Sequence, residues 1–122
     1  MSSRLSDWET RFVEYLAAAR VDVREGRQDY CALFAAGSVE AVTGDNPATQ
    51  FRGHYREVAD HLEAVVSGLF AEILPNVAGR GDLAWYDGSV GVIIGGDALF
   101  VGDDRTFTRV PRHLWDRAWS VG

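Results

Sequence analysis

One cysteine is the residue of this chain whose type and position could support nucleophilic chemistry. Cys31 lies in "QDYCALFAAG", residues 28–37, where a polar turn gives way to an apolar helical pattern. In the first turn of a helix, unpaired backbone N–H groups and the positive end of the helix dipole favour the thiolate. The same position suits a small buried side chain, because cysteine outside disulfides is among the most buried residue types. The position alone favours packing but leaves both interpretations open.

A cysteine nucleophile also needs a base, which in this chain must be His54, His61 or His113. His54 and His61 are seven residues apart and could share a helix face, but two histidines without a third ligand make a weak metal site. We expect all three imidazoles on the solvated surface. A single cysteine forms no internal disulfide and no zinc cage. We therefore expect no metal and no cofactor.

The carboxylates and glycines favour structural interpretations. Asp82, Asp87 and the pair Asp103-Asp104 lie at turn positions, where aspartate bonds to its own backbone. The run "GVIIGG", residues 91–96, resembles a phosphate-binding loop only superficially, because no helix follows it.

The first half of the chain shows helical spacing of apolar residues in three segments. A capping box of Ser6 and Glu9 predicts a first helix from Ser6 to Arg20, followed by a loop over residues 21–29. The second helix should begin at about Tyr30 and stop at Gly44, which puts Cys31 in its first turn. The third should cover about residues 54–69.

The second half shows the patterns of strands and tight turns. Residues 82–86 and 89–94 are joined by Asp87-Gly88, a dipeptide favoured in two-residue hairpins. Residues 98–102 and 107–110 continue an antiparallel meander, and 112–119 should form a short closing helix or turn that packs Leu114, Trp115 and Trp119 on the sheet. Helices followed by strands predict an α+β fold. At 122 residues we expect one domain, residues 1–122.

Composition narrows the function classes. The chain is 47% hydrophobic and 25% charged, as in globular proteins, and no apolar run approaches the roughly 20 residues of a membrane span. Its start lacks the layout of a secretory signal, so we expect folding in the cytoplasm. Twelve arginines, no lysine and eighteen carboxylates give a formal charge of -6, which disfavours nucleic-acid binding.

A cysteine helix followed by "GRGDLAWYDGSVGVIIGGDALFVG" resembles the NlpC-type cell-wall peptidases over about residues 26–119. In that family an Asp-Cys pair opens the helix, a Gly-Asp pair precedes the first strand, and the base histidine begins the next strand. The resemblance matches Cys31 to the nucleophile and Gly81-Asp82 to the Gly-Asp pair. It matches Ser89 to the base histidine and Gly102 to the residue that orients that base. In this chain Tyr30 separates the aspartate from the cysteine.

This resemblance implies a papain-like core, with N-terminal helices packed on a C-terminal antiparallel meander. It also implies a decayed or incomplete peptidase site, because serine and glycine replace the base and its orienting residue. The order of elements predicts that the stripe of Cys31, Phe34 and Val39 packs against the strand at 90–94, with Gly91 letting the two backbones approach.

More closely, the chain is similar to short proteins of unknown function encoded in the tail-gene clusters of phages and gene transfer agents. These carry "DCALFAA"-like signatures and an "AWRV"-like tail, here "RAWSV". The resemblance implies a structural or assembly component of the virion, located at the phage tail tip and made in the bacterial host cytoplasm. Its implied partners are hub and fibre-bearing tail proteins, and the bacterial cell wall is a further candidate.

Two other functions stay open. The chain could be an active cysteine peptidase that hydrolyses peptidoglycan or a tail protein with a displaced histidine. It could also be a small adaptor with no connection to tails. Most of the four tryptophans and six phenylalanines should fill the core, and we expect a partner to bind a patch that contains exposed aromatic residues.

Overall fold

The computed structural model describes residues 3–26, 31–51, 59–102 and 106–122, with the backbone alone for 59–61. Four helices come first: α1 (Trp8–Arg24), α2 (Cys31–Thr43), α3 (Ala48–Phe51) and α4 (Ala59–Leu69). Six strands follow: β1 (Ala71–Ile73), β2 (Leu83–Tyr86), β3 (Ser89–Ile93), β4 (Asp97–Val101), β5 (Phe107–Pro111) and β6 (Arg117–Ser120), with a short 3-10 helix, η1 (Arg112–Leu114), before β6. The strands form one antiparallel sheet in the order β1-β6-β2-β3-β4-β5. The predicted α+β class is confirmed.

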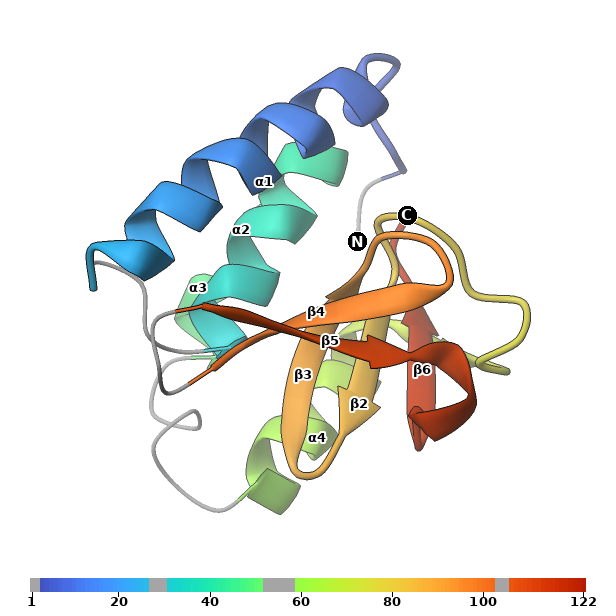
Figure 1. Ribbon diagram of the computed structural model, residues 1–122. Coiled ribbons are helices and arrows are strands. Elements are labelled where there is room, and N and C mark those ends of the chain that lie inside the picture. Colours follow the sequence, from blue (N-terminus) through green and yellow to red (C-terminus); the bar gives the residue numbers. More distant parts are fainter. Residues whose placement is uncertain (1–2, 27–30, 52–58, 103–105) are drawn as a thin grey trace.

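The central strands of the sheet are buried on both faces, whereas the edge strands β1 and β5 are largely exposed. Helices α1 and α2 pack against each other beside the sheet, and α4 lies near the opposite end of the strands (Figure 1). Arg4, near the start of the described chain, bonds to Val121 near its end. The larger core joins the helices to side chains such as Val90, Val92 and Trp119. A smaller core on the other face gathers residues such as Ile93, Phe100 and Trp115 under the connecting loops. This double coverage explains why β3 is apolar along almost its whole length.

Helix α1 differs from its predicted limits. It begins after Asp7, whose side chain makes no capping hydrogen bond, so the predicted capping box of Ser6 and Glu9 is wrong. It continues past Arg20 to Arg24, because Ala19 and Val23 keep the four-residue spacing and are both buried. The predicted loop therefore begins later, and four of its residues are helical.

The hairpin is confirmed, and so is the second helix from Cys31 onward, while its predicted start at Tyr30 lies outside the described residues. Helix α2 ends at Thr43, and Gly44 follows it with φ +86° and donates its N–H to the Glu40 carbonyl. Asp87 and Gly88 both have positive φ, as a two-residue hairpin turn requires. The predicted third helix is described only from Ala59, and residues 54–58 lie outside the described residues.

The structure of the closing segment differs from the prediction. Residues 112–119 contain η1 and most of β6, whereas the sequence predicted only a helix or turn. Strand β6 forms because it fills the position between β1 and β2, and this pairing outweighs local preference. Trp115 and Trp119 are buried as predicted, but Leu114 is 44% exposed.

Helix α2 packs on β3, and Phe34 and Val39 share a core with Val90 and Val92, as predicted. The expected role of Gly91 is wrong. Side chains alternate along a strand, so Gly91 faces away from α2, and a Cβ there would fall 2.5 Å from Phe100 Cζ. The glycine makes room for a ring of the smaller core and not for the helix.

No described helix is both long enough and apolar enough to cross a membrane.

Candidate functional site

The cysteine lies where helix α2 meets the end of strand β4. Cys31 is the first residue of α2, and its half-buried side chain contacts both cores. The backbone N–H of Val101 donates a hydrogen bond to Cys31 Sγ at 3.3 Å. The thiol in turn lies 3.7 Å from the Val101 carbonyl oxygen, which accepts from it. The sulfur is therefore held against both polar backbone groups of one strand residue.

The sheet explains why those backbone groups face the sulfur. Strands β3 and β4 pair through Val92 with Leu99 and through Ile93 with Ala98. Val101 lies beyond these pairs, at the end of β4. Val101 pairs with Phe107 of β5 on its other side, so the sulfur acts as a substitute partner on the side that faces β3, where an unpaired backbone group would cost free energy. This geometry gives Cys31 a structural role whether or not it reacts.

The two residues matched to the base and its orienting group lie at this same end of the sheet. Ser89 begins β3 opposite Tyr86, and Gly102 directly follows β4. Because β3 and β4 are antiparallel, the start of one and the end of the other lie at the same end of the sheet, beyond the residues that pair. Gly102 donates its N–H to the Thr106 carbonyl at 2.8 Å. Neither residue offers an imidazole or a carboxylate.

His113 lies far from the sulfur. It is exposed in η1, just after Pro111, which pairs with Asp97 at the beginning of β4. Cys31 contacts the other end of that strand, four residues on, or roughly 13 Å at the rise of a β-strand. His54 and the side chain of His61 lie outside the described residues. The described part of the chain holds no group of three metal-ligating side chains.

The Gly81-Asp82 pair ties the two ends of the chain together. Asp82 is 7% exposed, and its carboxylate accepts bonds from the Val121 and Gly79 backbone N–H groups, both at 2.9 Å. Arg4 donates to the same carboxylate at 2.8 Å and also to the carbonyls of Arg80 and Val121. We call Arg4, Asp82 and Val121 the terminal clasp. It satisfies a buried carboxylate, so Asp82 has a structural role.

The sequence matches one protein family over almost its whole length. A family model described as a domain of unknown function matches residues 3–121. The chain belongs to the DUF6950 family. No curated protein gives a significant match to the sequence. No solved structure gives one either.

The DUF6950 match includes all three residues of the terminal clasp and the contact between Cys31 and Val101. Sequence reasoning missed Arg4 and the Val101 backbone. Arg4 lies 78 residues before Asp82 in a short polar segment, so no spacing rule connects them. A backbone group carries no sequence signal at all. The glycine before Asp82 gave the one usable hint, because its φ of +89° is a conformation that favours glycine.

The expectation of a partner surface with exposed aromatic residues is wrong for the described part of the chain. The large apolar side chains exposed among the described residues are aliphatic: Val13, Val21, Leu74, Val77 and Leu114. Every described Phe, Tyr and Trp residue is buried or half-buried. Most aromatic residues fill the cores, as expected, and a patch of exposed aromatics is not found in this part of the chain.

Proposed function

We propose that this DUF6950 domain has a papain-like core of the NlpC type and is a structural or assembly component of a phage tail tip, without peptidase activity. The order of elements supports the first part of this proposal. A cysteine opens a buried helix, that helix packs on an antiparallel sheet, and Cys31 Sγ contacts the neighbouring strand. The resemblance to NlpC-type peptidases rests on the same order in the sequence.

The proposed lack of peptidase activity rests on which residue types lie at the end of the sheet near Cys31. Ser89 begins β3 and Gly102 follows the last residue of β4, Val101, so all three lie at the same end of the sheet. These are the residues that the resemblance matches to the base and its orienting group. A serine hydroxyl does not accept a thiol proton near neutral pH, whereas imidazole does. Glycine has no side chain to orient a base.

One observation favours an active cysteine peptidase as the second candidate. The Val101 N–H donates to Cys31 Sγ, and the sulfur lies at the beginning of a helix. Both features stabilise a thiolate. Activity then requires His54 or His61 within hydrogen-bond reach of the sulfur, because His113 lies at the opposite end of β4.

The tail-tip assignment rests on the resemblance to short tail-cluster proteins. It implies synthesis in the bacterial cytoplasm, incorporation into the virion, and contact with hub and fibre-bearing proteins near the cell wall. The charge of -6 supports a protein partner over the phage genome, because like charges repel at short range.

Affinity capture from infected cells tests this assignment. The tagged chain is cross-linked in a lysate of phage-infected host, captured and analysed by mass spectrometry, with uninfected lysate as the control. We expect hub or fibre-bearing tail proteins in the infected sample only. Recovery of DNA without any tail protein would reverse the assignment.

A further inference from the structure

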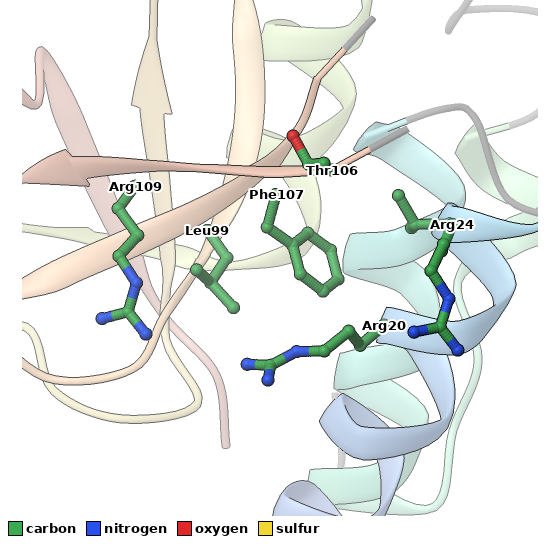
Figure 2. Close-up of a pocket in the computed structure, with 7 residues that line it drawn as sticks. Arg20, Arg24, Leu99, Thr106, Phe107 and Arg109 are labelled. Carbon is green, nitrogen blue, oxygen red and sulfur yellow. The ribbon is translucent and has the colours of Figure 1, made fainter. Parts of the chain in front are cut away.

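A groove runs between helix α1 and strands β4 and β5. Two adjoining cavities of about 290 and 370 Å³ share Arg20, Leu99, Phe107 and Arg109 in their walls. Figure 2 shows Arg20 and Arg24 extending from α1, and Leu99, Phe107 and Arg109 extending from the strands toward the same space. The groove is thus formed by two segments far apart in the sequence. No local pattern in the sequence indicates this groove.

The floor of this groove is apolar and fixed to the core. Leu99 is 5% exposed and Val23 is 1% exposed. Phe107 is half-buried, and its ring lies 4.8 Å from the ring of Phe34 in the main core. At the other end of the groove, Val13 is 53% exposed. An apolar side chain entering here would meet a surface that is already in place, which lowers the entropic cost of binding.

The charged residues of the groove wall, among those the structure describes, are all arginines: Arg20, Arg24 and Arg109. Arg109 lies 3.7 Å from Asp97, but their side chains are 60% and 38% exposed, so this ion pair is weak. Among the described residues, Arg4, Arg11 and Arg112 instead donate to backbone carbonyls, and Arg4 also pairs with the buried Asp82. Three guanidinium groups around an apolar opening are a local reversal of the overall charge of -6.

We propose that this groove binds an acidic peptide segment of a partner protein, with one apolar side chain on the floor and carboxylates on both sides of it. The arginines stand on opposite walls, two on α1 and one on β5. An occupant therefore needs separate anionic groups that flank an apolar part. An acidic peptide has this pattern, whereas a fatty acid carries one anionic end. The guanidinium fork binds carboxylates with two parallel hydrogen bonds. The proposal does not depend on the tail-tip assignment.

Fluorescence anisotropy with a defined probe tests the groove. The probe is a fluorescein-labelled peptide of sequence Asp-Glu-Leu-Phe-Asp-Glu, and the full chain is titrated into it. We expect saturable binding that weakens about tenfold or more in the double variant Arg20→Glu/Arg109→Glu, since two favourable charge contacts become repulsive. The matched control is Arg80→Glu, an exposed arginine outside the groove walls, which should change the affinity by less than about twofold. Circular dichroism checks that each variant is folded.

The apolar contact has its own control. Val13→Ser should weaken binding a few-fold, whereas Val77→Ser, at a similarly exposed valine outside the groove, should leave it unchanged. Unchanged affinity in the folded arginine double variant would overturn the proposal. Equal affinity for a lysine-containing peptide, for laurate or for a single-stranded oligonucleotide would overturn it as well, since each lacks the proposed pattern of recognition.

Discussion

At the scale of single residues, the contact between Cys31 and Val101 is compatible with both a packing role and a catalytic role of the cysteine. The sulfur accepts from one backbone group and donates to the other, so it completes the end of β4. The same N–H would stabilise a thiolate if a base were present. What decides between packing and catalysis is whether a base lies within reach of the sulfur, and not the cysteine itself.

Restoring an imidazole tests the match of Ser89 to the missing base. In Ser89→His we expect Cys31 to react with iodoacetamide faster near pH 7 than in the wild type, because an imidazolium within reach stabilises the thiolate. The rate is measured against pH, and the single cysteine makes the label specific. Thr108→His, at an exposed position on β5, is the control and should leave the rate unchanged. Equal pH profiles for both variants would contradict the papain-like match.

The terminal clasp predicts a large effect from one carboxylate. Asp82→Ala removes the acceptor of Arg4 and of two backbone N–H groups, and we expect it to lower the free energy of unfolding by about 3 kcal/mol. Urea denaturation measures the change. Asp97→Ala removes the exposed partner of Arg109 and should cost less than about 0.5 kcal/mol. Similar losses in the two variants would show that the clasp contributes little.

At the scale of elements, the sheet depends on close packing across its two faces. Gly91 on β3 leaves space for the ring of Phe100, which is 5% exposed in the smaller core. A Cβ at this glycine would lie 2.5–2.7 Å from three ring carbons, so either the ring or the strand must move.

Gly91→Ala should therefore destabilise the protein by about 1–3 kcal/mol through overpacking. In the double variant Gly91→Ala/Phe100→Leu, the loss of unfolding free energy should be smaller than the sum of the losses in the two single variants. The smaller leucine side chain leaves space for the new methyl group. A double-mutant cycle in urea measures this coupling. Gly96→Ala is the control, since no atom lies within 4 Å of its added Cβ. An additive cycle would contradict the proposed contact.

An ion-pair network joins α4, β1 and β6. Arg117 on β6 donates to Glu63 at 2.8 Å and to Glu72 at 2.6 and 3.1 Å. The hydrogen bonds from Arg117 lower the pKa of Glu72 below its ordinary value of 4.5, and they raise the pKa of Arg117.

Because the folded pKa of Glu72 is depressed, its stabilising effect is present above pH 4.5 and is lost as the pH falls through the lower folded pKa. NMR titration should give a midpoint below 4.5 in the wild type and a higher midpoint in Arg117→Leu. Because glutamine does not titrate, the free energy of unfolding should differ less between pH 7 and pH 3 in Glu72→Gln than in the wild type. A wild-type midpoint at or above 4.5 would contradict the network.

The elements differ in how far the sequence predicts them. Helix α2 and the β2–β3 hairpin carry local signals, namely an apolar stripe, a terminal glycine and Asp87-Gly88. Strands β1 and β6 were missed because β1 has three residues and β6 is defined by its pairing with strands distant in sequence. Tertiary pairing of this kind overrides local preference.

At the scale of the whole molecule, arginine is the only side chain with a permanent positive charge, and the arginines that the structure describes differ in what they contact. Arg4 and Arg112 hold loops through carbonyl oxygens, and Arg117 joins three elements. Arg20 and Arg109 instead line an open groove. The planar guanidinium group has five N–H donors, so one arginine can bind several oxygens at once, which a lysine ammonium could not do in the same geometry.

The candidate site could be predicted from the sequence only in part. The cysteine at the beginning of a helix and the hairpin strands were predictable from local pattern, whereas Ser89 was singled out only by the resemblance to NlpC-type peptidases. The Val101 contact, the terminal clasp and the groove join segments separated by tens of residues. Nothing in composition or periodicity encodes such contacts, because they arise only when the sheet assembles.

Hydrolysis is the property that separates the two candidate functions most directly. The purified chain and Cys31→Ala are incubated with peptidoglycan fragments from a plausible host, and released peptides are measured by mass spectrometry. Nucleophile, base and oxyanion donors act as a unit, so the loss of one removes most of the rate. We predict no released peptide from either protein. Cleavage by the wild type that disappears in Cys31→Ala would contradict the proposed function and would require a histidine within reach of the sulfur.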